Sequence, residues 1–121
     1  LLVLSACNTA LGDAQSELGF AGLAVLAGVK SALGSLWYVS DEGTVVLMTN
    51  FYGQLRNTSV KVEALRQAQL AMMRGESRIV NGKITTSQGN FSLPLELAQL
   101  GNTDFRHPYY WSSFTLIGSP W

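Results

Sequence analysis

The stretch Leu1-Leu-Val-Leu-Ser-Ala-Cys-Asn-Thr-Ala-Leu-Gly12 carries the only cysteine of the chain, Cys7, soon after a run of four aliphatic residues. Such a run is typical of a strand buried on both faces, so we expect a central strand of a parallel sheet here. Cys7 would then follow the carboxyl end of that strand. Ligands and reactive groups of open α/β sheets gather at this end. The opening stretch therefore predicts a strand that delivers a thiol to a cleft.

Size and composition limit what this thiol can do. A chain of 121 residues with 47% hydrophobic and 13% charged residues favours one packed domain over disorder. Its eight basic and eight acidic residues cancel, so we expect a soluble partner or substrate and neither nucleic acid nor a membrane surface. The longest apolar segment, Leu18 to Val39, is interrupted by Lys30 and falls short of a membrane span. A single cysteine provides no disulfide framework and no zinc cluster, so we expect no metal, no cofactor and a reducing cytoplasm.

The apolar segment after residue 18 predicts a helix followed by a strand. Leu18 to Val29 is apolar almost all round, which is typical of a helix covered on most sides. Ser31 to Val39 reads as a second central strand. A strand, a helix and a strand in this order predict a βαβ unit with two parallel strands. We therefore expect the region from Trp37 to Asp41 to lie at the same sheet edge as Cys7.

Helical spacing predicts two further helices after residue 40. Either Ser40 or Asp41 can cap the first one by accepting a backbone N–H. The second helix runs roughly from Lys61 to Arg74, and Gly75 would end it in a left-handed conformation. The apolar faces predicted from the spacing are Val45, Met48, Tyr52 and Leu55 for the first helix, and Val62, Leu65, Ala68 and Met72 for the second.

The last third of the chain is predicted to contain strands. The stretch from Glu76 to Asn90 is polar and includes Ile79-Val-Asn-Gly-Lys-Ile84, whose Asn-Gly pair is typical of a tight hairpin turn within residues 76–104. We expect an inserted surface hairpin or loop there. Aromatic and β-branched residues between His107 and Gly118 predict a last strand. The whole chain is therefore predicted to be an α/β domain.

Four blocks stand in this order along the chain: LVLSACNTALG around Cys7, GSLWYVSD at 34–41, the helix pair FYGQLR and EALRQAQLAMM, and HPYYWSSFTLIGSPW at 107–121. Together they resemble the CHAT domain, a family of caspase-like cysteine peptidase domains that are often fused to tetratricopeptide repeats and distantly similar to separase, and the resemblance implies a protein or peptide substrate. The resemblance runs in order over nearly the whole chain, apart from residues 76–104. It implies a three-layer caspase-like fold with a mainly parallel sheet and helices on both faces, of which residues 1–121 would be the C-terminal part.

The resemblance also implies roles for individual residues. Cys7 matches the family's nucleophile, whose thiolate attacks the scissile carbonyl to form a thioester, and its backbone N–H would contribute to the oxyanion hole. The block LWYVSD is similar to the separase pattern in which an acidic residue, here Asp41, recognises a basic P1 side chain. Ser5 and Trp37 would line the same S1 pocket. The implied function is a cysteine endopeptidase that cleaves after a basic residue.

One part of the catalytic machinery is missing from the sequence. In caspase-like peptidases the general base is the histidine of a His-Gly pair, which ends a strand well before the cysteine. The sequence starts at Leu1, so we expect this histidine to lie outside it. The only histidine, His107, matches a family position without a catalytic role, so we expect it to be structural. A free thiol of pKa ~8.5 is only a few per cent thiolate at neutral pH. We therefore expect these residues alone to have little or no activity until joined to an N-terminal half.

The start of the chain inside an apolar run predicts association. If Leu1 to Ser5 is a central strand whose neighbour lies in another segment, its unpaired backbone groups invite pairing. We therefore expect the fragment to self-associate or to bind a second chain, with the missing N-terminal half and tetratricopeptide repeats as natural partners.

Each assigned residue has an alternative interpretation. Cys7 can be a buried core thiol. Leu-Ser-Ala-Cys also fits a bacterial lipobox, but the apolar run is too short and has no basic segment before it. Asp41 can be a helix N-cap, and Trp37 a core aromatic residue. The alternative function for the whole chain is a catalytically inactive peptidase-like scaffold or signalling module, and a His-Gly pair upstream of Leu1 would favour the enzyme instead.

Overall fold

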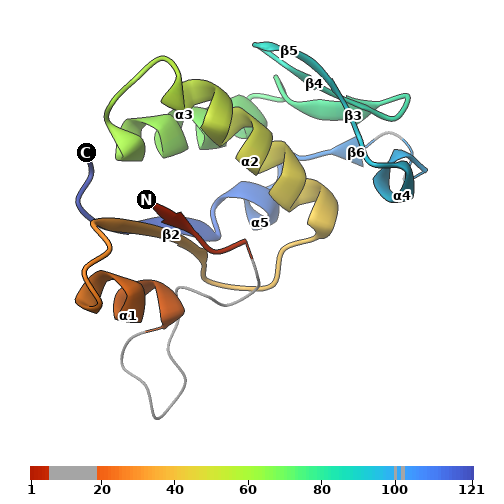
Figure 1. Ribbon diagram of the computed structural model, residues 1–121. Helices are drawn as coiled ribbons and strands as arrows, with labels where there is room; N and C mark the ends of the chain where they lie inside the picture. Colours follow the sequence, from red (N-terminus) through yellow and green to blue (C-terminus); the bar gives the residue numbers. More distant parts are fainter. Residues whose placement is uncertain (6–18, 100, 102) are drawn as a thin grey trace. The chain divides into compact units, whose positions relative to one another are not determined.

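The computed structural model describes residues 1–5, 19–99, 101 and 103–121 of the chain (Figure 1). The chain divides into two compact units. We call residues Leu1–Val39 and Ser112–Trp121 the terminal unit, and Ser40–Trp111 the central unit. Cys7, the predicted nucleophile, lies outside the described residues.

The terminal unit contains a three-stranded sheet in the order β1-β2-β7, formed by β1 (Leu2–Val3), β2 (Ser31–Ser35) and β7 (Phe114–Gly118). β1 and β2 are parallel, as predicted for the βαβ unit. All five residues of β2 are buried, and β2 is the middle strand. The prediction of a central opening strand placed its second neighbour in another segment, and among the described strands β1 is half-buried and pairs with β2 alone.

Helix α1 (Phe20–Leu26) lies between β1 and β2 in the chain and packs on β2 and β7. Its buried residues are the small Ala21 and Gly22, whereas Phe20 and Leu26 are each 71% exposed. The prediction of a helix covered on most sides is therefore wrong. Small side chains let the helix backbone approach the sheet closely, so the large apolar side chains are left on the opposite face.

Two long helices, α2 (Asp41–Leu55) and α3 (Lys61–Met73), pack on each other in the central unit. The ends of both follow the sequence prediction closely. Ser40 caps α2, and Gly75 ends α3 with φ +73°. The N–H of Glu76 donates to the carbonyl of Ala71 at 2.9 Å, and the N–H of Gly75 donates to Met72 at 3.0 Å. These two bonds satisfy carbonyls that the last turn of a helix would otherwise leave unpaired.

The buried faces of the two helices match the predicted faces to different degrees. The prediction is confirmed for Leu65, Ala68 and Met72 in α3 but wrong for Val62, which is 46% exposed. The face predicted for α2 is shifted, and Tyr52 is 50% exposed. A polar residue explains the shift. Asn50 is buried in α2 because its Nδ2 donates to the Val46 carbonyl at 2.8 Å and its Oδ1 accepts from the Ser77 hydroxyl at 3.1 Å. The residues buried in α2 are Gly43, Val46, Leu47, Asn50 and Phe51.

The central unit also contains an antiparallel four-stranded sheet in the order β5-β4-β3-β6. Asn81 (φ +52°) and Gly82 (φ +72°) form the turn between its first two strands, which confirms the predicted hairpin. Further strands extend the hairpin into a full sheet. The elements are β3 (Arg78–Val80), β4 (Lys83–Thr86), β5 (Gly89–Ser92), α4 (Leu95–Ala98) and β6 (Thr103–Asp104).

The predicted last strand is confirmed only from Phe114 onward. Before it, Pro108–Trp111 forms the short helix α5, which is consistent with the preset φ of proline at the first position of a helix. β7 then pairs antiparallel with β2. Mixed helices and strands agree with the predicted α/β class. However, among the described strands only β1 and β2 run parallel, so the prediction of a mainly parallel sheet is wrong.

Candidate functional site

The described part of the predicted site begins at the carboxyl end of β1. Val3 lies opposite Leu33 of β2, and the N–H of Leu4 donates to the Leu33 carbonyl at 2.8 Å. Ser5 follows directly after this last ladder bond and is exposed. Ser5 therefore stands where the chain leaves the sheet.

The carboxyl end of β2 lies at the same edge. Beyond Ser35, the N–H of Leu36 donates to the Ser113 carbonyl at 2.8 Å, and the half-buried Trp37 comes next. Because neighbouring parallel strands end at one edge of a sheet, Ser5 and Trp37 come from the same edge of the terminal unit. The hydroxyl of Ser113 is buried there and has no hydrogen-bond partner among the described residues, a feature that the sequence did not single out.

Asp41 is the first residue of α2 and opens the central unit, whereas Ser5 and Trp37 belong to the terminal unit. The hydroxyl of Ser40 accepts the N–H of Gly43 at 3.2 Å and caps the helix. The alternative interpretation of Asp41 as the N-cap is therefore wrong. Its side chain is exposed and makes no hydrogen bond or ion pair with any residue that the structure describes. This carboxylate is available to a ligand.

Two further residues were assigned from the sequence, Cys7 as the nucleophile and His107 as a structural residue. Cys7 falls in 6–18, outside the described residues. His107 is exposed, and its Nδ1 accepts the N–H of Tyr109 at 3.1 Å while its carbonyl accepts the N–H of Tyr110 at 3.1 Å. Both bonds hold the first turn of α5. The structural role predicted for His107 is therefore confirmed.

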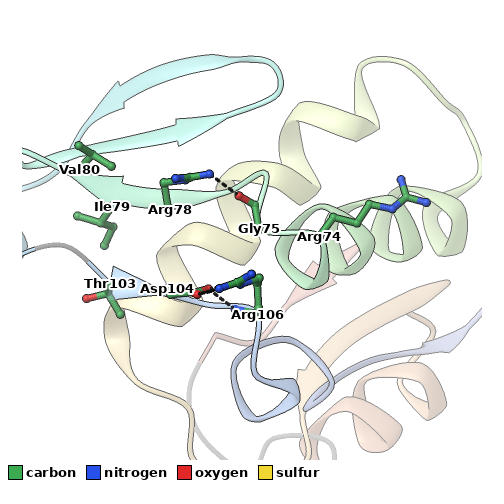
Figure 2. Close-up of a pocket in the computed structure, with 8 residues that line it drawn as sticks. All are labelled: Arg74, Gly75, Arg78, Ile79, Val80, Thr103, Asp104 and Arg106. Atoms are coloured by element: carbon green, nitrogen blue, oxygen red, sulfur yellow. Dashed lines mark hydrogen bonds and ion pairs between the residues drawn. The ribbon is translucent and has the colours of Figure 1, made fainter.

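A second cluster, which the sequence did not reveal, lies in the central unit. A pocket of about 400 Å³ opens between the end of α3, β3 and β6, and we call it the basic pocket (Figure 2). Antiparallel pairing of β3 with β6 places Arg78 opposite Asp104. The residues that line the basic pocket are Arg74, Gly75, Arg78, Ile79, Val80, Thr103, Asp104 and Arg106.

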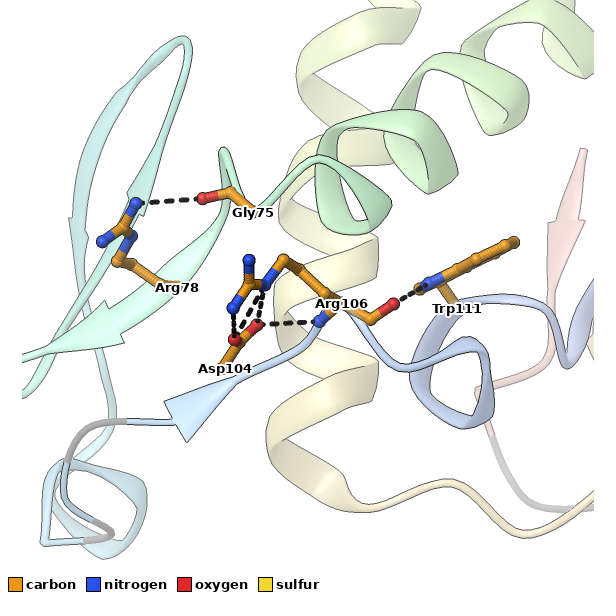
Figure 3. Close-up of polar contacts among 5 residues, drawn as sticks. All are labelled: Gly75, Arg78, Asp104, Arg106 and Trp111. Atoms are coloured by element: carbon orange, nitrogen blue, oxygen red, sulfur yellow. Dashed lines mark hydrogen bonds and ion pairs between the residues drawn. The ribbon is translucent and has the colours of Figure 1, made fainter.

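An exposed ion pair dominates the electrostatics of the basic pocket (Figure 3). Nη2 of Arg106 donates to Oδ2 of Asp104 at 2.6 Å, and Nε donates to the same oxygen at 2.8 Å. These hydrogen bonds, followed by one from the Arg106 N–H, hold the pKa of Asp104 below its ordinary value. The carboxylate in turn raises the pKa of Arg106. The sequence did not reveal that this ion pair lies near Arg78, because Arg78 is far from Asp104 and Arg106 in the chain and only the pairing of β3 with β6 brings them together.

The described residues also bear on two other classes of feature, metal sites and membrane-spanning helices. Within the described residues, no three His, Cys, Asp or Glu side chains gather in a way that could hold a metal ion. Nor does the described part of the chain contain a helix long and apolar enough to cross a membrane.

Comparison with known proteins gives one positive finding. The family model described as "CHAT domain" matches residues 1–119, which is nearly the whole chain. A search of curated proteins and a search of solved structures each gave no match.

Proposed function

This chain belongs to the CHAT domain family, and we propose that it carries the nucleophile of a cysteine endopeptidase that cleaves after a basic residue. The family is caspase-like and related to peptidases. The observation that carries the proposal is the family match, because it spans both Cys7 and Asp41. The proposal includes a three-layer caspase-like arrangement of the whole domain.

Cys7 is the proposed nucleophile. In the sequence it follows Ser5, the last described residue at this sheet edge, by two residues. The thiolate would attack the scissile carbonyl carbon, and a C–S bond would replace the C–N bond as the amine leaves with a proton from the general acid. Water would then hydrolyse the thioester and release the acid product and the thiol.

Asp41 is the proposed determinant of specificity. Its exposed carboxylate is unpaired among the described residues, so no existing bond has to break when a substrate cation arrives. Both of its oxygens can accept N–H groups from an arginine at P1, a geometry that a lysine does not reproduce. Ser5 and Trp37 would form the walls of the same pocket.

We propose that the general base is a histidine outside these 121 residues. The chain has one histidine, His107, and its Nδ1 already holds the turn of α5. Without a base, a thiol of ordinary pKa is only a few per cent ionised at neutral pH. The edge of β1 that faces away from β2 is a suitable place for a strand of the segment that brings the base, since β1 has one partner among the described strands.

Cleavage of fluorogenic peptides by the whole protein tests this proposal. Peptides that differ only in arginine, lysine or alanine at P1 should be cleaved in that order of kcat/KM. Cys7→Ala should abolish cleavage of all three, and equal cleavage by this variant and the parent would refute the nucleophile. Asp41→Asn should lower kcat/KM for the arginine peptide at least about tenfold, as expected for a lost charge-assisted pair. Glu42→Gln, which changes the neighbouring acidic residue in the first turn of α2, is the matched control.

The inactive scaffold is the second candidate, favoured by the engagement of the only histidine. Alkylation distinguishes the two, because Cys7 is the only cysteine of these 121 residues and peptide mapping reports its label separately from any other thiol of the whole protein. In an enzyme, an arginyl chloromethyl ketone should label the whole protein much faster than its alanyl counterpart. Equal labelling by the two, at the rate of a free thiol, would support the scaffold.

The proposed association through β1 has its own test. Sedimentation of the 121-residue chain over a range of concentrations should show self-association, because the edge of β1 that has no partner among the described strands can pair with a second copy. A stable monomer at every concentration would contradict it. Val3→Pro, which removes a backbone donor from this short strand, should weaken the association.

A further inference from the structure

The basic pocket is a candidate ligand site that the proposed peptidase does not use. Its lining comes from the end of α3, from β3 and from the segment from Thr103 to Arg106, all within the central unit (Figure 2). A volume of about 400 Å³ lies in the range of pockets that take small organic ligands.

The charge of the basic pocket is positive. Arg74, Arg78 and Arg106 contribute three positive charges and Asp104 one negative charge, which leaves +2. The chain as a whole has eight basic and eight acidic residues, so this excess is local. Glu76 lies next to Gly75 in sequence and is exposed, but it does not line the pocket. The pocket therefore favours an anion.

Two of the guanidinium groups are held in place (Figure 3). Arg106 pairs with Asp104 through Nε and Nη2, and its side chain lies against Gly75, where an added Cβ would come within 3.0 Å of its Cδ. Nη2 of Arg78 donates to the Gly75 carbonyl at 3.2 Å. The indole N–H of Trp111 fixes the Arg106 backbone by donating to its carbonyl at 3.0 Å. Side chains that are already ordered lose less entropy when a ligand binds.

Hydrogen-bond donors remain available on all three arginines. A guanidinium carries five N–H groups, and Arg78 uses Nη2 while Arg106 uses Nε and Nη2. The guanidinium of Arg74 points away from Asp104 in Figure 2 and makes no hydrogen bond or ion pair with a described residue. Arg74 is exposed, so its side chain can turn toward a bound anion.

We propose that the basic pocket binds a phosphate monoester. A phosphate monoester carries a charge of about −1.5 to −2 at neutral pH and three acceptor oxygens, which suits the +2 charge and the several free donors. A single carboxylate fits less well, because one already occupies the pocket as the Asp104 side chain, and +2 remains after that pairing. Arginine forks bind phosphate oxygens in pairs, which supplies geometric selectivity as well as charge.

Calorimetric titration of the 121-residue chain tests the ligand class. The probes are a capped phosphoserine peptide, its serine counterpart, adenosine monophosphate and inorganic phosphate. We expect binding of at least one phosphate ester and none of the serine peptide, and the tighter ester identifies the source. Binding of the serine peptide as tight as that of its phosphorylated form would overturn the proposal. Inorganic phosphate that binds as tightly as both esters would also overturn it, because the pocket would then recognise the free ion.

Substitutions place the binding in this pocket. Arg78→Gln should weaken the better ester about tenfold or more, and Arg78→Lys should have an intermediate effect because it keeps the charge and loses the fork. Arg66→Gln is the matched control, because Arg66 lies on α3 outside the basic pocket and pairs with Glu63 at 3.0 Å. Circular dichroism checks that each variant is folded. Equal losses in Arg78→Gln and Arg66→Gln would refute the site.

Two further measurements separate this site from the proposed peptidase. Affinity should fall as the pH drops through about 6, where a phosphate monoester takes up a proton, and it should fall with added salt. Cys7→Ala should leave the affinity unchanged, because the described lining residues on which this proposal rests all belong to the central unit and have no part in the proposed peptide cleavage. The two proposals can therefore fail separately. Loss of phosphate binding with intact peptide cleavage would overturn only the proposed ligand of the basic pocket, and loss of cleavage with intact phosphate binding would overturn only the proposed peptidase. An affinity independent of both pH and salt would contradict phosphate recognition.

Discussion

The two sheets of this chain are built in different ways. In the central unit, β3, β4 and β5 follow one another in sequence and pair as neighbours through short turns. In the terminal unit, β2 pairs with β1 and with β7, and both partners are far from it in sequence. Local turn chemistry can specify the first sheet, whereas the second depends on contacts between distant segments.

The candidate sites do not divide in this way. Ser5 and Trp37 share an edge only because β1 and β2 pair in parallel across the βαβ connection. In the basic pocket, Arg78 is local to the hairpin, but Asp104 and Arg106 reach it through the pairing of β6 with β3. Distant pairing therefore brings together the residues of both sites.

The largest expected effect tests how much the terminal sheet depends on its middle strand. Leu33 of β2 is fully buried and pairs with both β1 and β7. Leu33→Ala should lower the free energy of unfolding by about 2–5 kcal/mol, the usual cost of a large-to-small change in a core. Leu95→Ala is the control, since Leu95 is 81% exposed and its loss should change stability by less than about 0.5 kcal/mol. Urea unfolding measures both, and similar values would contradict the assigned core.

Two glycines with positive φ, one in each sheet, allow the two sheets to be compared. Gly118 at the end of β7 has φ +97°, and an added Cβ would lie 2.5 Å from the Lys30 carbonyl oxygen. Gly89 in β5 has φ +135°, and a Cβ there would meet nothing within 4 Å. Both Ala variants incur a conformational cost of about 1–3 kcal/mol. Overpacking against the backbone should make Gly118→Ala worse by about 1–3 kcal/mol more.

Thermal unfolding of the two glycine variants provides the measurement. The melting temperature of Gly118→Ala should fall well below that of Gly89→Ala. If the two melting temperatures fell equally, the terminal sheet would tolerate the shift of the Lys30 carbonyl, and the close approach of this segment to β7 would not constrain the fold.

Features set by local chemistry could be predicted from the sequence. Asn81 and Gly82 signal their turn because both adopt positive φ, and Gly75 signals the end of α3 for the same reason. The outward face of α1 could not be predicted in this way. Small residues Ala21 and Gly22 make the contact with the sheet, and a simple count of apolar residues favours burial of the large ones instead.

Less of the candidate sites than of the turns and helix ends could be predicted from the sequence. The meeting of Ser5 and Trp37 at one sheet edge followed from the βαβ pattern. The basic pocket could not be predicted from the sequence, because no local pattern connects Arg78 to Arg106, and the strand β6 between them is only two residues long. Very short strands carry almost no periodic signal, so their pairing emerges only from the folded chain.

A moderate effect is expected where the central unit begins. Ser40→Ala removes the hydroxyl that accepts the Gly43 N–H, so it should cost about 1 kcal/mol of stability. Asp41→Ala should cost less, because this carboxylate makes no hydrogen bond with a described residue and contributes only through the helix dipole, about 0.3–1 kcal/mol. Urea unfolding of the two variants distinguishes them. A larger loss for Asp41→Ala would return Asp41 to a capping role and weaken its proposed part in specificity.

The smallest effect concerns the acid titration of Asp104. Its hydrogen bonds to Arg106 hold its folded-state pKa below the ordinary value of 3.8, so the folded chain binds this proton more weakly than the unfolded chain does. The contribution to stability is therefore fully present above the ordinary pKa and is lost as the pH falls through the lower, folded-state pKa. Arg106→Gln should raise the pKa of Asp104 measured by NMR, because the charged partner is gone. Arg66→Gln, which breaks a separate pair with Glu63, should leave it unchanged. An Asp104 pKa that stayed low in Arg106→Gln would mean that Arg78, rather than the bidentate pair, sets the charge balance of the basic pocket.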